Sequence, residues 1–280
     1  MSDKAPARPE PVEGRGRTLS TVLDDILAAK RRDLERSRRN VPLADLEARI
    51  KSVPPPANFS GALMGDRVRL IAEVKKASPS RGLLCPDFDP ARLARTYAEN
   101  GAAAISVLTE VDHFQGSLEH LAQVKEVVRG YGLPVLRKDF IFDPYQLCEA
   151  RAHGADAALL IVAILSPGQL GELFAAAQGL WLQCLVEVHS QAELETTLEA
   201  GAEVIGINHR DLRTFRVDLS LTERLRPLIP GGKVVVAESG ITSAADVARF
   251  RALGVNAVLV GEALVTAPDV AAKVRELAGG

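Results

Sequence analysis

One pattern recurs four times along this 280-residue chain and constrains its fold more than any other feature. A glycine followed by alanine or valine opens a short apolar run at residues 101–108, 154–161, 201–207 and 254–260. The four glycines lie 53, 47 and 53 residues apart. Further apolar runs lie at or near 68–74, 134–136, 182–188 and 234–237, and segments of helical character such as 118–128 and 244–253 follow them. Short apolar strands that alternate with helices predict a parallel sheet covered by helices.

The number of these units selects among parallel-sheet folds. Eight strand–helix units are the count of a closed (β/α)8 barrel, the TIM barrel. An open doubly wound sheet is the rival, but no GxGxxG follows the first strand. Repetition at twice the strand–helix length also favours the barrel. A glycine before a strand suits the C-terminal cap of the preceding helix. We therefore expect an α/β barrel over residues 67–280.

The chain before the barrel is predicted to be helical. Apolar residues at helical spacing predict one helix near 19–38, and a second is expected over 43–50. Three consecutive prolines at 54–56 then impose an extended linker. Residues 18–66 are thus expected to form a helical extension that makes one structural domain with the barrel. Residues 1–17 are rich in Pro, Gly and charge, and we expect a disordered lead without a secretory signal.

Composition excludes several classes of function. The chain has 34 Lys and Arg against 36 Asp and Glu, and this balance lacks the basic excess of a nucleic-acid binder. Its longest apolar run is nine residues, at 157–165, whereas a membrane span needs about 18. The histidines and cysteines lack the spacing of a metal site or a disulfide framework. We expect buried, reduced thiols at Cys85, Cys148 and Cys184 in a cytoplasmic protein that uses no metal and binds a small molecule. A monomer is the favoured state, and an oligomer stays open.

Polar residues stand where the predicted strands end. In a barrel these ends converge on one rim, where the chemistry of such folds takes place. Charge within apolar strands is costly unless it is paired or functional. The strand ends therefore predict an active site, with an ion-pair network that closes the barrel top as the competing explanation. The residues are Glu73, Lys75, Lys138, Glu187, Asn208 and Glu238.

Three further features lie beside these strand ends. Ser239-Gly240 and Gly261-Glu262 follow the last two strands, where many barrels hold phosphate on backbone N–H groups. The polar segment 76–82 is longer than a minimal turn, so it could be a lid that carries Lys76 and Ser78 or an ordinary loop. Phe114 and Phe140 could contact an aromatic ligand, but from their positions alone we favour loop packing.

Six motifs together resemble one family. They stand in order at six strand ends: IAEVKKASPS (71–80), SVLTE (106–110) with FQGS (114–117), LRKDFI (136–141), LVEV (185–188), GINHRDL (206–212) and AESGI (237–241). The chain from residue 20 to its C-terminus is similar to indole-3-glycerol-phosphate synthase. That resemblance implies a (β/α)8 barrel with an N-terminal helical extension. It also implies an enzyme of tryptophan biosynthesis, a carboxy-lyase that uses neither cofactor nor metal. The substrate would be 1-(2-carboxyphenylamino)-1-deoxyribulose 5-phosphate, converted to indole-3-glycerol phosphate by ring closure, decarboxylation and dehydration.

The resemblance assigns catalytic roles to the strand-end residues. Lys138 would be the general acid that protonates the substrate carbonyl oxygen. Lys75 would hold the substrate carboxylate and take part in proton transfer. Glu187 would be a general base or stabilise the iminium that follows ring closure. Glu73 and Glu238 would orient the lysines and bind hydroxyl groups, while Asn208 and Arg210 would bind substrate across the rim.

The resemblance also assigns the binding residues. Ser78, Ser239, Gly240, Gly261 and Glu262 would surround the phosphate, and Phe114 and Phe140 would hold the anthranilate ring. The substrate-binding set is completed by Leu159 and Leu212. Glu262 stands where some family members have a small serine, so we expect its carboxylate to point outward. We also expect the pKa of the acid lysine to be lowered by neighbouring cations and apolar walls.

Two other functions stay open at this point. A lysine aldolase on a phosphate-binding barrel would form a Schiff base at Lys138 or Lys75, which borohydride would trap. A non-catalytic phosphosugar-binding barrel would bind ligand without turnover.

Overall fold

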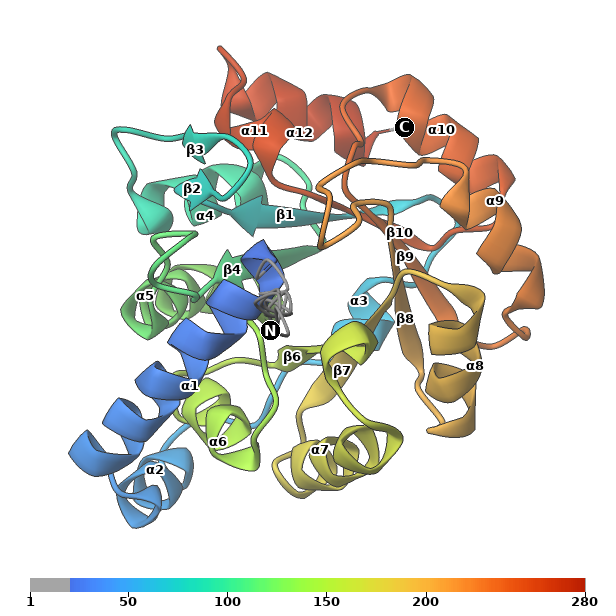
Figure 1. The fold of residues 1–280 in the computed structure, drawn as a ribbon. Helices are drawn as coiled ribbons and strands as arrows, with labels where there is room; N and C mark the ends of the chain where they lie inside the picture. The colour runs from blue at the N-terminus through green and yellow to red at the C-terminus, as the bar shows by residue number, and fades with distance from the viewer. Residues whose placement is uncertain (1–20, 280) are drawn as a thin grey trace, which may run out of the picture.

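The fold is a closed barrel of eight parallel strands. The computed structural model describes residues 21–279. The strands pair in the order β1-β10-β9-β8-β7-β6-β5-β4, and β1 pairs with β4 to close the ring (Figure 1). This confirms the predicted (β/α)8 barrel. The barrel strands are β1 (Arg69–Val74), β4 (Ala104–Leu108), β5 (Val135–Lys138), β6 (Ala157–Ile161), β7 (Gln183–Val188), β8 (Val204–Asn208), β9 (Val234–Glu238) and β10 (Ala257–Val260).

Helices surround these strands (Figure 1). A helix follows every barrel strand, and after β8 it is only five residues long. After β10 the chain forms two helices, the second of which packs on α4 and closes the outer ring. The ring consists of α4 (Pro90–Glu99), α5 (Leu118–Arg129), α6 (Pro144–Ala152), α7 (Pro167–Gly179), α8 (Gln191–Glu199), α9 (Leu221–Leu225), α10 (Ala244–Ala252), α11 (Glu262–Val265) and α12 (Val270–Ala278).

Short local signals set the limits of these helices. A serine or aspartate precedes each of seven helices and accepts a hydrogen bond from a backbone N–H of the first turn, which satisfies a group that the helix leaves free. The four repeated glycines each follow a helix C-cap with φ between 74° and 105°. Glycine adopts this left-handed conformation without steric cost. The repeat in the sequence therefore marks four helix ends, as predicted. The capping residues are Asp89, Ser117, Asp143, Ser166, Ser190, Ser243 and Asp269.

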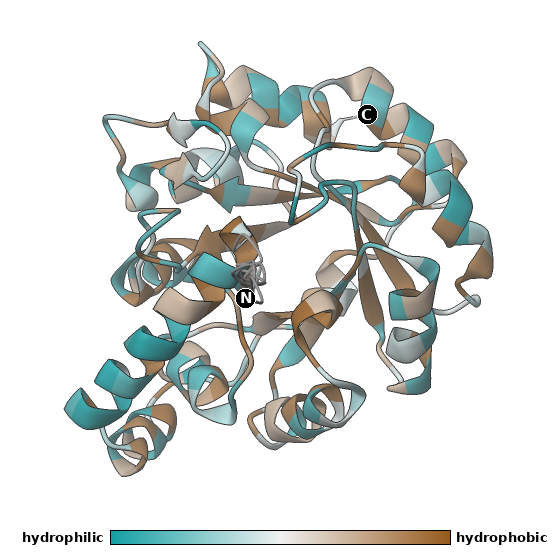
Figure 2. Ribbon diagram, viewed as in Figure 1, coloured by the Kyte–Doolittle hydropathy of each residue, from teal (hydrophilic) through white to brown (hydrophobic). Residues whose placement is uncertain are grey.

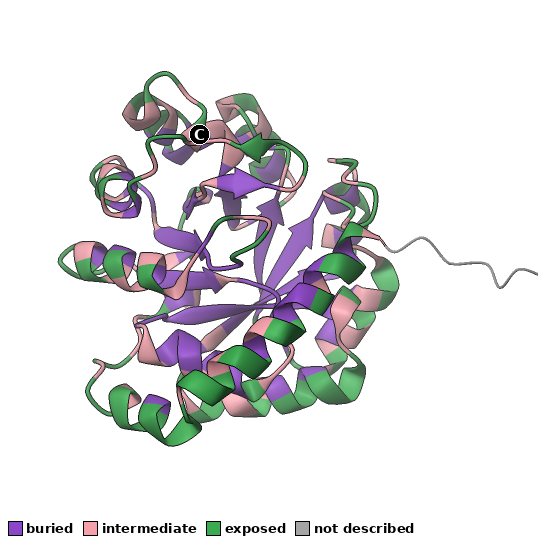
Figure 3. Cartoon of the chain, turned by 60° about the vertical axis from the view of Figure 1, so that its left-hand side comes forward, coloured by how far each residue is buried: buried purple, intermediate pink, exposed green. Residues whose placement is uncertain are grey.

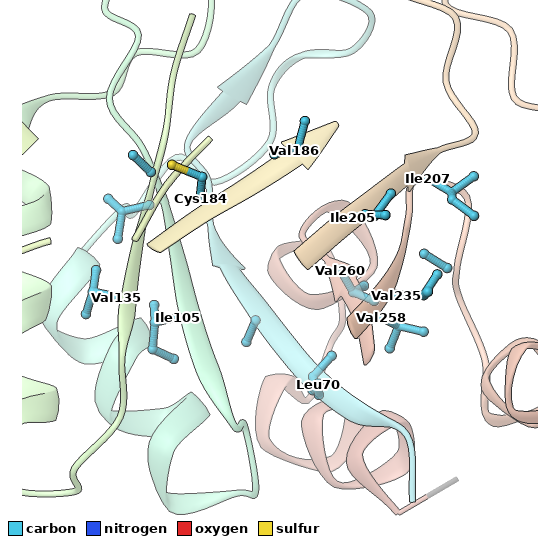
Figure 4. Packing of buried hydrophobic residues seen from close by; sticks show 14 of the residues in the cluster. Leu70, Ile105, Val135, Cys184, Val186, Ile205, Ile207, Val235, Val258 and Val260 are labelled. Atoms are coloured by element: carbon cyan, nitrogen blue, oxygen red, sulfur yellow. The ribbon is translucent and has the colours of Figure 1, made fainter. Parts of the chain in front are cut away.

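Side chains alternate between two apolar cores because successive residues of a strand point to opposite faces. The outer core lies between the strands and the helices and contains Leu70, Val186 and Val235 (Figure 4). The inner core fills the barrel and contains Ile71, Leu185 and other residues one position away from the outer set. Figure 2 shows the strands as largely hydrophobic, and Figure 3 shows them as almost wholly buried. Residues that share the parity of Ile71 in β1 therefore face the barrel interior.

From residue 21 onward, three helices precede the barrel. They are α1 (Val22–Asn40), α2 (Leu43–Ile50) and α3 (Phe59–Ala62). In α1, the capping box between Thr21 and Asp24 fixes the start. Leu23 and Ile26 are buried against the inner core, and α2 packs on α6. The two expected helices are found, with α1 three residues later at its start than predicted. The predicted lead at 1–17 lies outside the described residues.

Several local features differ from the sequence expectations. The apolar runs were expected to begin at the four repeated glycines, but each strand begins three residues after its glycine. The glycine and the two residues that follow it belong to the turn. The segment after β1 contains a small hairpin of β2 (Ala77–Ser78) and β3 (Gly82–Leu83). Two 3-10 helices, η1 (Val162–Ile164) and η2 (Arg226–Leu228), were not expected. All three cysteines are free thiols. Cys184 is buried, whereas Cys85 and Cys148 are partly exposed. Within residues 21–279, none of the helices is long and apolar enough to cross a membrane.

Candidate active site

A cavity of about 310 Å³ opens where the strands end. We call this end of the barrel the mouth. The cavity brings together all the catalytic, substrate-binding and phosphate-binding residues assigned from the sequence, although these residues come from all eight strands or the loops that follow them. Lys76, which a lid could have carried, is not among the lining residues. The lining includes Glu73, Lys75, Ser78, Phe114, Lys138, Phe140, Leu159, Glu187, Asn208, Arg210, Leu212, Glu238, Ser239, Gly240, Gly261 and Glu262.

Strand parity aims the reactive groups into this cavity. In β7, Leu185 belongs to the inner core and Val186 to the outer core, so Glu187 faces inward. The same alternation turns Lys138 of β5 and Glu238 of β9 inward. The mouth therefore carries the charged side chains because each is the last inward residue of its strand.

Lys138 lies between two carboxylates. Its Nζ atom is 3.2 Å from Oε2 of Glu187 and 3.3 Å from Oε2 of Glu238. Burial lowers the pKa of Lys138, but the charges of Glu187, Glu238 and Glu73 outweigh burial and raise the pKa above its usual value. The expectation of a lowered pKa was wrong, because the nearest charged groups are carboxylates. Lys138 is thus an ammonium group at neutral pH.

The two carboxylates differ in their ionisation. Burial raises the pKa of Glu187, but Lys138, His189 and a hydrogen bond from Asn208 outweigh burial and leave the pKa below its usual value. Burial also raises the pKa of Glu238, and the negative charge of Glu187 adds to this, so it reaches about 7. One carboxylate is therefore ionised at neutral pH while its neighbour titrates. Such a pair can accept and supply protons at one position.

Lys75 forms a second pair at the mouth. Its Nζ atom lies 3.2 Å from Oε1 of Glu73 and 5.7 Å from the centre of the Phe114 ring. The rings of Phe114 and Phe140 are tilted by 44°, with centres 6.4 Å apart. Both rings line the cavity, so they form an apolar wall next to a cation. An aromatic carboxylate is a suitable ligand for such a wall.

A hydrogen-bond network orients Asn208. Its Oδ1 atom accepts from Ser239 Oγ at 2.8 Å and from the backbone N–H of Arg210 at 3.0 Å. The amide group is then left to donate to Glu187. Asn208 thus links Glu187 to the turn that follows β9.

Two glycines leave room for carboxylates. A Cβ atom on Gly206 would overlap Oε1 of Glu238, and one on Gly261 would overlap Oε1 of Glu73. Gly206 lies in β8 at a position that faces the barrel interior, and Gly261 directly follows β10. A larger residue at either position would displace an acidic side chain of the site.

The turn after β9 has an unusual backbone. Ser239 and Gly240 have φ values of 69° and 78°. Such a conformation is strained for serine and is easy for glycine. Successive N–H groups in left-handed and turn conformations can face an anion, and this turn lines the cavity. These features suit the phosphate contact that the resemblance implies.

Glu262 lies at the edge of the same region. Its side chain is about a third exposed, and its carboxylate is 3.6 Å from Nε of Arg81 and 3.9 Å from Nη2 of Arg210. Arg81 belongs to the turn of the β2–β3 hairpin, so this acid connects the segment after β1 to the end of β10. In the same segment Ser78 lines the cavity, and its buried Oγ has no hydrogen-bond partner among the described residues.

Sequence reasoning missed several residues of the site. Leu23 and Ile26 of α1 line the cavity, although only packing could place them there. Glu110 also lines the cavity and accepts backbone N–H bonds from the loop that carries Phe114. His189 contacts Glu187. The sequence signal that could have found His189 was its position two residues beyond Glu187, which continues the alternation of β7. Among residues 21–279, no group of three or more His, Cys, Asp or Glu side chains is arranged to hold a metal ion.

Known proteins of one family resemble this chain over most of its length. A family model described as "Indole-3-glycerol phosphate synthase" matches residues 23–277. A protein of that name from Dehalococcoides mccartyi strain BAV1 is 55% identical over 91% of this chain and 99% of its own length. One from Roseiflexus sp. strain RS-1 is 54% identical over 94% of this chain and 100% of its own length.

A solved structure bears on the fold alone. Thiamine phosphate pyrophosphorylase from Pyrococcus furiosus superposes with a TM-score of 0.58 and 21% identity, over 79% of this chain and 96% of that protein. The family match and the close relatives decide the identity. The chain belongs to the indole-3-glycerol phosphate synthase family.

Proposed function

We propose that this chain converts 1-(2-carboxyphenylamino)-1-deoxyribulose 5-phosphate to indole-3-glycerol phosphate, with loss of CO2 and water. The observation that carries the proposal is the pair of lysines, Lys75 and Lys138, which line one cavity at the ends of different strands and are held by separate carboxylates. Two ammonium groups at fixed places allow two acid steps without rearrangement of the enzyme. The name of the family and of the relatives supports the same reaction.

The first step is ring closure. The carbon of the aromatic ring that bears the carboxylate attacks the substrate carbonyl carbon, and Lys138 gives a proton to the carbonyl oxygen. Phe114 and Phe140 hold the ring, while Lys75 holds the carboxylate. The nitrogen acquires positive charge as an iminium, and the ionised Glu187 stabilises it. Glu187 suits this role because its pKa lies below its usual value, so its carboxylate is ionised.

Decarboxylation and dehydration complete the reaction. The C–CO2 bond breaks, its electron pair returns to the ring and neutralises the iminium. The hydroxyl group formed in the first step then leaves as water after it receives a proton from Lys75 or Lys138. A carboxylate, Glu187 or Glu238, removes a proton from the carbon next to the nitrogen. Two protons are thus delivered and one is recovered, so each turnover takes one proton from solvent.

The phosphate end of the substrate fixes its position. Ser78 Oγ and the turn at Ser239 and Gly240 line one side of the cavity, with Gly261 and the backbone of Glu262 beside them. Arg210 and Asn208 bind substrate oxygens across the mouth, with Glu73 and Glu238 for the hydroxyl groups. Leu159 and Leu212 add apolar contact to the substrate. Binding at the remote phosphate contributes energy that orients the reacting atoms.

The test is indole fluorescence after mixing the purified chain with the substrate in the presence of EDTA. We expect a rise with the wild type and a loss of about 100-fold or more in kcat for Lys138→Met. Lys51→Met is the matched control, because Lys51 is an exposed lysine at the end of α2. No rise with folded wild type would reject the reaction, and a borohydride-trapped adduct on Lys138 or Lys75 would favour an aldolase.

We also propose that the chain acts as a monomer in the cytoplasm. One chain supplies the acid, the base and the phosphate-binding residues that the proposed reaction needs, so a monomer suffices for it. Three unpaired cysteines support a reducing compartment. We further propose that residues 18–66 and the barrel at 67–280 are one structural domain, as the buried contacts of α1 support.

A further inference from the structure

His189 lies next to Glu187 but does not line the cavity. It directly follows β7, two residues beyond Glu187, and its side chain is only 13% exposed. Its Nε2 atom lies 3.4 Å from Oε1 of Glu187, and its Nδ1 atom lies 3.3 Å from Oε2 of Glu193 in α8. Among the described residues, none forms a hydrogen bond with the buried Nε2 atom of His189. A buried ring nitrogen therefore faces a carboxylate oxygen of the site without a formed bond.

The two oxygens of Glu187 have different neighbours. Oε2 lies 3.2 Å from Nζ of Lys138, while Oε1 faces His189. The side chain of Glu187 is only 1% exposed, so neighbouring protein groups surround most of its carboxylate. A buried carboxylate needs donors on both oxygens to remain ionised. Lys138 and the amide of Asn208 already donate to Glu187, and His189 is in position to add a donor at Oε1.

Other charges around the ring favour its protonated form. Glu187 faces it from β7, Glu193 from α8 and Glu238 from β9, and Asp211 after β8 also interacts with it. The neighbouring η1, Val162–Ile164, has no titratable side chain. Burial lowers the pKa of His189, but its bond to Glu193 and these carboxylates outweigh burial and raise it. A protonated ring donates from both nitrogens, to Glu193 and to Glu187.

We propose that protonated His189 is a positioning residue for Glu187. Its Nε2–H donates to Oε1 while Lys138 holds Oε2, so the carboxylate stays ionised and in one orientation toward the cavity. Glu193 holds the other side of the ring and keeps the imidazole protonated. The inference rests on the proposed function, in which the ionised Glu187 stabilises the iminium. His189 acts only through Glu187 and makes no contact with substrate.

The first test is His189→Gln, which keeps a polar side chain and removes the charge. We expect kcat to fall about tenfold, less than the about 100-fold of a lost general acid or base, because Glu187 remains. KM should stay near the wild-type value. The acid limb of the kcat–pH profile should move to higher pH by about one unit, since Glu187 loses a neighbouring positive charge. Added imidazole should restore activity to His189→Ala.

The second test leaves the ring in place. Glu193→Gln removes a negative charge beside His189, so the pKa of the ring should fall. NMR titration of the ring, without substrate, should show this, and the alkaline limb of the kcat–pH profile should move to lower pH with it. His153→Gln is the matched control, because that ring binds the carbonyl oxygen of Glu149 at the end of α6.

The outcomes separate this inference from the proposed function. A wild-type chain without turnover would reject the function, while the NMR titration would still test the contact between His189 and its carboxylates. Wild-type kcat and an unchanged pH profile in His189→Gln would overturn the inference. So would a kcat loss in that variant with no shift of the acid limb and no rescue of His189→Ala by imidazole, because those results describe a structural role. If His189→Gln does not fold, an unchanged ring pKa in Glu193→Gln overturns the inference.

Discussion

The Nζ atom of Lys30 lies 2.6 Å from Oδ2 of Asp139, which is 109 residues further along the chain. Both side chains are buried. The same carboxylate oxygen accepts from Thr109 Oγ1 at 2.6 Å and from Nη2 of Arg137 at 2.9 Å. Burial raises the pKa of Asp139, but Lys30 and Arg137 outweigh burial and hold the pKa well below its usual value. Helix α1 is thus tied to the residue that directly follows Lys138.

Lys30→Met should destabilise the protein by about 3–5 kcal/mol, because it leaves a buried carboxylate with one cation fewer. Urea denaturation at pH 7 measures the loss. Arg36→Met in the same helix is the control: its ion pair with Asp33 is exposed, so it should cost under about 1 kcal/mol. Equal losses in the two variants would contradict a special role of the buried pair.

Gly206→Ala should reduce stability by about 1–3 kcal/mol, because the new methyl group collides with Glu238. The cost should be smaller in a Glu238→Ala background, where the colliding oxygen is gone. A double-mutant cycle by urea denaturation measures this coupling. Gly171→Ala is the control: this exposed glycine of α7 has open space around it, so alanine should stabilise the helix by about 0.5–1 kcal/mol. Additive effects of the two site changes would reject the steric explanation.

The pH dependence of stability should report Glu238. Its pKa rises from 4.5 in the unfolded chain to about 7 in the fold, so the folded state binds the extra proton. Its contribution to stability is therefore full below about pH 4.5 and is lost as pH rises through about 7. The free energy of unfolding of the wild type, relative to Glu238→Gln, should fall across this window. Comparison of the two proteins cancels the titration of other groups, and a constant difference would mean that Glu238 does not titrate there.

The sequence predicts the barrel because its signals are local and repeated. Gly101 and its three counterparts each end a helix, and an apolar strand follows at a constant distance. The strand ends of a closed barrel lie at one rim for any loop conformation. The sequence alone therefore predicts that Lys138 and Glu238 lie near each other, and they do.

What the sequence could not predict depends on distances between separate elements. The raised pKa of Lys138 follows from Glu187 and Glu238, which approach it from β7 and β9. Leu23 lines the cavity because α1 packs across the mouth. The contact of His189 with Glu193 needs the position at which α8 begins. Pattern and spacing identify which residues share a rim, and only three-dimensional packing identifies which of them touch.

The alternation of the strands also limits how this site can change during evolution. Deletion of one residue inside β7 would turn Glu187 toward the helices and bring Val186 or Val188 into the cavity. Substitution at a fixed position changes one functional group. A shift of the strand by one residue instead replaces every side chain that the strand turns toward the cavity. Insertions and deletions should therefore accumulate in the loops between elements, while new chemistry on this scaffold arises by exchange of side chains at strand positions of constant parity.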